Sequence, residues 1–119
     1  MLVAGLLPPS AVPAAAHAIV LESVPVPGAI LVRSPERVSL RFNSKVEKRL
    51  TRVTLAKSDG APRLVSIASD GPGPDREPDR IVIPLPPLPP GPYVIRYKVL
   101  SADGHVTEGA LRFTVGPSP

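Results

Sequence analysis

The sequence of 119 residues contains no cysteine and no tryptophan, and its one methionine is Met1. Without cysteine, the chain cannot form a disulfide, a thiolate metal site or a thiol nucleophile. The lack of cysteine does not exclude export, because not every exported protein needs a disulfide. Beyond Met1 there is no sulfur atom at all, which excludes the thioether and thiolate sites that soft metal ions prefer.

Aromatic side chains are few as well, and the core must therefore consist mostly of Val, Leu and Ile. The only aromatic residues are Phe42, Tyr93, Tyr97 and Phe113. Proline and glycine are frequent, with 18 and 9 residues, and both are poorly tolerated inside helices and central strands. No apolar run is long enough to cross a bilayer as a helix. This composition favours one small domain of short elements joined by many turns.

Alternating apolar and polar residues recur in short segments, as is typical of half-buried strands. The expected strands cover residues 18–23, 29–32, 37–42, 51–57, 63–68, 80–83, 93–100 and 110–115. The residues expected to face the core are Ile19, Leu21, Val38, Leu40, Phe42, Val53, Leu55, Leu64, Tyr93, Ile95, Tyr97, Val99, Leu111, Phe113 and Val115. The segments 69–80 and 101–109 are expected to be connections, and the proline-dense segment 85–92 is expected to stay outside interior strands. About seven to nine short strands predict an all-β sandwich of two sheets.

The chain is basic, with 14 Lys and Arg residues against 10 Asp and Glu residues and an isoelectric point of about 10.0. The basic residues are spread along the chain, and only the segment from Lys45 to Arg52 is dense. No aromatic stacking platform accompanies this segment, so we expect no nucleic-acid partner. The segment is expected to be a solvated surface, or a docking patch for an acidic partner.

Residues 1–16 have the outline of a secretory signal peptide. They carry no charge, contain a short apolar run from Leu2 to Leu7, and end in the small residues Ala14–Ala16. A basic n-region is missing, and a disordered apolar tail is the alternative. Cleavage after Ala16 predicts a periplasmic or extracytoplasmic protein whose mature chain, residues 17–119, begins at His17.

A histidine at a mature N-terminus can chelate a metal ion with its α-amino group and its imidazole together. The only other histidine of the chain, His105, lies two residues after Asp103, with Gly104 between them. Each of these residues, taken singly, is explained as an ordinary turn or surface residue. The hypothesis of a metal site depends on their combination: one histidine at the mature N-terminus and the other two residues from an aspartate. An amine, two imidazoles and a carboxylate suit Cu(II) in a tetragonal plane. We therefore predict one Cu(II) ion bound by His17, Asp103 and His105, with an affinity that falls below about pH 6 as the imidazoles are protonated.

Three segments resemble the CopC family of periplasmic copper-resistance proteins: HAIVLESVPVPGAIL, RVSLRFNSKV and GPYVIRYKVLSADGHVTEGALRFTVG. The most specific part of the resemblance runs from Ser101 to Val115. The resemblance implies a Greek-key, immunoglobulin-like β-sandwich or barrel. It also implies Cu(II) binding by the residues that match His17, Asp103 and His105. It further implies a CopD-like membrane copper transporter as a partner, although the mature chain has no transmembrane segment of its own.

Three functions are compatible with the sequence. The first is a non-enzymatic carrier or buffer of Cu(II) in copper homeostasis and resistance. The second is a metal-free immunoglobulin-like interaction module, because a sandwich fold alone decides nothing about function. The third is an oxidative copper enzyme with a histidine brace, which is disfavoured because Asp103 fills the equatorial position that oxygen would need.

Overall fold

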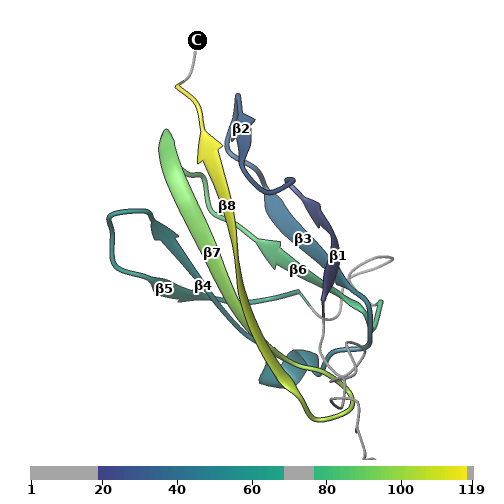
Figure 1. Cartoon of the computed structure of the whole chain (residues 1–119). Coiled ribbons are helices and arrows are strands. Elements are labelled where there is room, and N and C mark those ends of the chain that lie inside the picture. Colours follow the sequence, from purple (N-terminus) through teal and green to yellow (C-terminus); the bar gives the residue numbers. More distant parts are fainter. Residues whose placement is uncertain (1–18, 69–76, 118–119) are drawn as a thin grey trace, which may run out of the picture.

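The computed structural model describes residues 19–68 and 77–117, and in these ranges the chain forms eight strands (Figure 1). The strands are β1 (Val20–Val24), β2 (Ala29–Leu31), β3 (Arg37–Phe42), β4 (Arg52–Lys57), β5 (Arg63–Val65), β6 (Arg80–Pro84), β7 (Gly91–Leu100) and β8 (Val106–Val115). One 3-10 turn, η2 (Lys48–Leu50), precedes β4. The predicted signal peptide, residues 1–16, and His17 lie outside the described residues.

The strands form two sheets, which confirms the predicted β-sandwich. The smaller sheet has the order β1-β3-β6, and the larger has the order β2-β8-β7-β4-β5. All neighbouring pairs are antiparallel except β2 and β8, which are parallel. Within the described ranges, no helix is long and apolar enough to cross a membrane.

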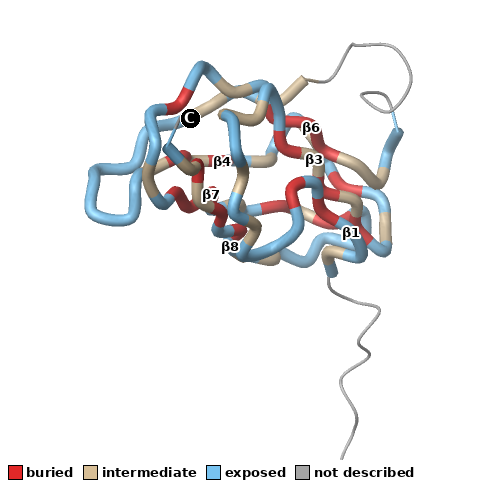
Figure 2. Tube along the Cα trace, turned by 90° about the horizontal axis from the view of Figure 1, so that it is seen from above, coloured by how far each residue is buried: buried red, intermediate tan, exposed pale blue. Residues whose placement is uncertain are grey.

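The core lies between the two sheets, where Figure 2 shows buried segments of β3 and β6 facing those of β4, β7 and β8. Because side chains alternate between the faces of a strand, Val38, Leu40 and Phe42 of β3 point inward and are almost fully buried. On the larger sheet, Ile95 and Phe113 meet them from the other side. The inward faces predicted for β3, β4, β7 and β8 are confirmed.

Two predicted faces are wrong, and both belong to strands at the edge of a sheet. In β1, Ile19 and Leu21 are about half exposed, because the pairing of β1 with β3 shifts between Val20 and Glu22 and an extra residue reverses which side chains face the core. In β5, Leu64 is exposed, whereas its neighbour Val65 packs against the core.

Two predicted boundaries are also wrong, at the two ends of the β7–β8 hairpin. The segment 85–92 is expected to stay outside interior strands, but its last two residues, Gly91 and Pro92, begin the interior strand β7 and lie opposite Val115 and Thr114. At the other end, β8 begins at Val106 rather than Ala110. The predicted connection of residues 101–109 therefore shrinks to residues 101–105.

Candidate metal centre

The connection between β7 and β8 is a tight turn that contains both described candidate ligands. The backbone N–H of Ser101 donates to the carbonyl oxygen of His105 at 2.8 Å, and the N–H of Gly104 donates to the carbonyl oxygen of Ser101 at 2.9 Å. Gly104 has a φ of +94°, a conformation that glycine adopts without steric cost. Gly104 thereby lets the chain reverse between Asp103 and His105.

A second segment, residues 45–47, holds this turn in place. The N–H of Ala102 donates to the carbonyl oxygen of Lys45 at 3.0 Å, and the N–H of Glu47 donates to the carbonyl oxygen of Leu100 at 2.8 Å. Val46, which is buried, forms a β-bridge with Ser101. The turn is therefore anchored on both sides of its first residue, which limits how far its side chains can move.

The structure brings Asp103 and His105 into direct contact. Nδ1 of His105 lies 3.1 Å from Oδ1 of Asp103, and the backbone N–H of His105 donates to the same oxygen at 3.2 Å. The side chain of Asp103 is 44% exposed, and that of His105 is 52% exposed. Both remain open to an ion arriving from solvent.

Ser101 is a residue of the site to which the sequence analysis gave no role. Its side chain is almost completely buried, and its hydroxyl donates to Oδ1 of Asp103. This hydrogen bond, followed by those from His105, lowers the pKa of Asp103 to about 2. The sequence signal for this role is a serine two residues before an aspartate in a predicted turn, because short polar side chains often form hydrogen bonds within turns. Ser101 thus orients Asp103 and stabilises its ionised form.

The geometry of this pair fits two neighbouring ligands of one metal ion. Donor atoms bound side by side in a square plane, each about 2.0–2.1 Å from the ion, lie about 2.9 Å apart. The 3.1 Å between Nδ1 of His105 and Oδ1 of Asp103 is close to this separation. One nitrogen and one carboxylate oxygen, with no sulfur, are the donors that suit Cu(II) rather than Cu(I).

The third predicted ligand, His17, lies outside the described residues. In the ranges 19–68 and 77–117, no group of three His, Cys, Asp or Glu side chains gathers that could hold a metal ion. The described part of the chain therefore contains two residues of the predicted set, Asp103 and His105.

The first described residue is attached to the same end of the sandwich as this pair. The N–H of Ile19 donates to Oδ1 of Asn43 at 2.9 Å, and the N–H of Asn43 donates to the carbonyl oxygen of Ile19 at 2.8 Å. Asn43 lies two residues before Lys45, which binds the β7–β8 turn. Figure 1 shows the start of β1 in the lower half of the molecule, the half that ends in the β7–β8 turn.

Known proteins share both the sequence pattern and the fold. Copper resistance protein C of Escherichia coli is 31% identical over 121 residues, covering 97% of this chain and 94% of that protein. Protein YobA of Escherichia coli K12 is 29% identical over 103 residues, covering 84% and 79%.

Two crystal structures superpose well on this one. CopC from Methylosinus trichosporium OB3b has a TM-score of 0.74 at 31% identity and covers 87% of this chain and 97% of its own. PcoC, a methionine-rich copper resistance protein from Escherichia coli, has a TM-score of 0.67 at 29% identity and covers 84% and 99%. In addition, the family model of the CopC domain matches residues 20–116, which include all eight strands. This chain belongs to the CopC family.

Proposed function

We propose that this protein binds one Cu(II) ion outside the cytoplasm and acts in copper resistance as a carrier or buffer. The ligands would be the α-amino group and imidazole of His17, the carboxylate of Asp103 and the imidazole of His105. The observation that carries the proposal is the contact between Asp103 and His105, oriented by the buried hydroxyl of Ser101. A copper resistance protein of similar length supports the physiological role.

The donor pair supports Cu(II) in particular. Carboxylate oxygen and imidazole nitrogen bind Cu(II) more strongly than the other divalent ions of the first transition row. A metal ion at this pair is bound by the unprotonated Nδ1 of His105 and the ionised carboxylate of Asp103. Copper binding therefore releases protons and weakens in acid.

The anchoring of Ile19 supports the participation of His17. Two residues of extended chain span at most about 7 Å, so a residue at position 17 stays within that reach of Ile19. Ile19 is bonded to Asn43, and the segment that follows Asn43 is bonded to Ser101 and Ala102. A mature N-terminus at His17 would thus lie on the side of the molecule that carries Asp103 and His105.

Export follows from the signal-like residues 1–16, and the site itself depends on their removal. Only a free amine can bind the metal together with its own imidazole, because a backbone amide nitrogen is a poor ligand. The carrier would receive or deliver copper at the membrane, where a CopD-like transporter is the proposed partner. With four donors around the ion, no equatorial position remains for oxygen, and we therefore propose binding without catalytic turnover.

Titration of the mature protein, beginning at His17, with Cu(II) tests the proposal. We expect one ion per chain in isothermal titration calorimetry, and a large loss of affinity in His105→Ala and Asp103→Asn. Asp59→Asn is the matched control, since Asp59 also precedes a glycine in a turn but lies in the β4–β5 hairpin. Equal Cu(II) affinity in His105→Ala and the unmodified protein would overturn the assignment of ligands.

Two further measurements separate the alternatives. A form that keeps residues before His17 lacks the free amine and should bind Cu(II) much more weakly. Sustained oxygen consumption by the copper-loaded protein with ascorbate would favour an oxidative enzyme instead. Absence of tight Cu(II) binding by the mature protein would favour a metal-free interaction module.

A further inference from the structure

The outer face of the larger sheet carries four basic side chains on three adjacent strands. Arg52 is on β4, Arg96 and Lys98 are on β7, and Arg112 is on β8; all four are exposed. The register places Arg52 directly opposite Lys98, with Arg96 two residues along from Lys98 on the same face. We name these four residues the basic face.

In the smaller sheet, two basic residues also lie opposite each other, and a carboxylate of this chain neutralises them. Arg41 of β3 lies opposite Arg80 of β6, and like charges directly opposite each other destabilise a sheet. There, Oε1 of Glu22 lies 3.6 Å from Arg41 Nε and 3.8 Å from Arg80 Nη2. Glu77 adds a second ion pair to Arg80 at 2.7 Å. One carboxylate thus bridges two opposed guanidinium groups.

On the basic face, no such bridging ion pair forms among the described residues. Among residues 19–68 and 77–117, no acidic side chain forms an ion pair with any of its four members. Glu108 lies opposite Lys98 on β8, yet the two do not form an ion pair. Side chains directly opposite each other have their Cβ atoms about 5 Å apart, so Arg52 and Lys98 leave a position that one external carboxylate can bridge.

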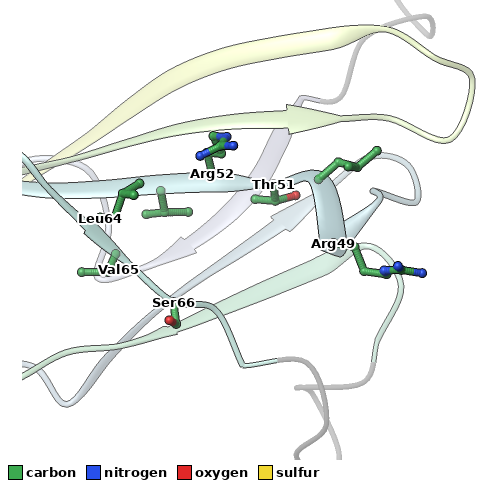
Figure 3. Close-up of a pocket in the computed structure, with 8 residues that line it drawn as sticks. Arg49, Thr51, Arg52, Leu64, Val65 and Ser66 are labelled. Atoms are coloured by element: carbon green, nitrogen blue, oxygen red, sulfur yellow. The ribbon is translucent and has the colours of Figure 1, made fainter.

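A groove adjoins this position where β5 separates from β4. The last residue pair between the two strands is Val53 with Val65, after which the chain crosses toward β6, where Ala68 bridges Val82. The groove has a volume of about 380 Å³, and Figure 3 shows Arg52, Thr51 and Leu64 beside it, with Arg49 extending from η2 away from the strands.

Apolar side chains line the same groove. Leu50 and Leu64 are 63% and 67% exposed, and both belong to its lining together with Arg52. Large exposed apolar side chains beside charged ones are typical of a recognition surface. The groove offers room for an apolar side chain next to the position that a carboxylate can occupy.

We propose that the basic face and this groove together form a docking surface for an acidic segment of a partner protein. A carboxylate of the partner bridges Arg52 and Lys98, as Glu22 bridges Arg41 and Arg80 in the other sheet. An apolar side chain beside it enters the groove between Leu50 and Leu64. Charge complementarity of this kind mainly raises the association rate and selects the partner.

The shape of the surface favours a protein segment over a lipid bilayer. A bilayer is contacted by protruding apolar residues together with clustered basic ones. Here the two exposed apolar side chains, Leu50 and Leu64, flank a groove next to Arg52, which can hold one side chain of an extended segment. The docking surface uses no copper ligand, so its test is independent of the metal.

The test uses a fluorescently labelled, glutamate-rich peptide with interspersed leucines, and the same peptide with glutamine in place of glutamate. Fluorescence anisotropy measures binding to the full chain at low and at physiological salt. We expect binding of the glutamate peptide alone, with NMR shift changes centred on Arg52, Leu64 and Lys98. The double variant Arg52→Glu/Lys98→Glu should lose about tenfold or more in affinity, because two attractive charges become repulsive.

The matched control is Arg33→Glu/Arg37→Glu, which changes the net charge equally but lies before and within β3 on the other sheet. Circular dichroism verifies that both variants fold. Equal losses in the two double variants, or no binding of the peptide by the unmodified protein at low salt, would overturn the proposal. Binding of phosphatidylglycerol vesicles without binding of the peptide would overturn it in favour of a membrane surface.

Discussion

Gly109 permits the close approach of an aromatic ring, and Gly109→Ala should therefore destabilise the hairpin that presents the candidate copper ligands. Gly109 of β8 lies opposite Tyr97 of β7. A Cβ atom at this position would lie 2.3 Å from Oη and 2.4 Å from Cζ of Tyr97. Because non-bonded heavy atoms are normally about 3.5–4.0 Å apart, the ring has to move by more than about 1 Å. It then loses its edge-to-face packing on Phe42, where the ring centroids are 5.8 Å apart.

The expected loss is about 1–3 kcal/mol of the free energy of unfolding. Overpacking of a core costs about 1–3 kcal/mol, and the aromatic pair contributes about 0.5–1.5 kcal/mol beyond its buried area. Against this, alanine is better than glycine in a strand by about 0.5–1 kcal/mol. In a domain of about 100 residues, the net loss lowers Tm by roughly 5–15 °C.

Urea unfolding monitored by circular dichroism measures this loss, and a second background isolates its cause. In Tyr97→Leu the ring atoms that oppose the new methyl group are absent, so Gly109→Ala should be neutral or stabilising there. The coupling between the two substitutions in a double-mutant cycle is the decisive quantity. The same cost of Gly109→Ala in both backgrounds would show that the ring of Tyr97 is not what opposes the new methyl group.

Five further predictions concern the turn that contains Asp103. Ser101→Ala should weaken Cu(II) binding about 10- to 100-fold, as is usual for residues that orient a ligand, and unchanged affinity in calorimetry would contradict its role. The same substitution should raise the pKa of Asp103 from about 2 toward its ordinary value, as followed by NMR of its carboxyl carbon. Because folding lowers this pKa, the ionised carboxylate stabilises the protein above about pH 4. This contribution disappears as the pH falls toward about 2, so the difference in unfolding free energy between the unmodified protein and Asp103→Asn should shrink over that range. Gly104→Ala should cost about 1–2 kcal/mol because of its positive φ, whereas Gly60→Ala, which meets only ordinary contacts, should not destabilise the protein in thermal unfolding. Cu(II) affinity should fall steeply below about pH 6, and a constant affinity from pH 5 to 8 would exclude imidazole ligands.

The sequence predicted the strands at the centre of the sheets because these strands must bury one face. In β3 and β7, every second residue is apolar and the strand is paired on both sides, so the pattern and the pairing agree. At the edges, where β1 and β5 are paired on one side only, the pattern was weaker. A shift of one residue at Val20 and the departure of β5 after Val65 then decided which side chains are buried.

For the candidate site too, one part could be predicted from the sequence and another part depends on the fold. The sequence alone limited the candidate donors to nitrogen and oxygen, because it has two histidines, an aspartate two residues from one of them, no cysteine and no methionine after Met1. Only the tertiary structure decided that His105 turns back onto Asp103 and that a buried Ser101 holds that carboxylate. It also decided that Arg52 and Lys98 face each other without the bridging carboxylate found at Arg41 and Arg80. The physical reason is that the residue type sets what an atom can bind, whereas the pairing of distant strands sets which atoms meet.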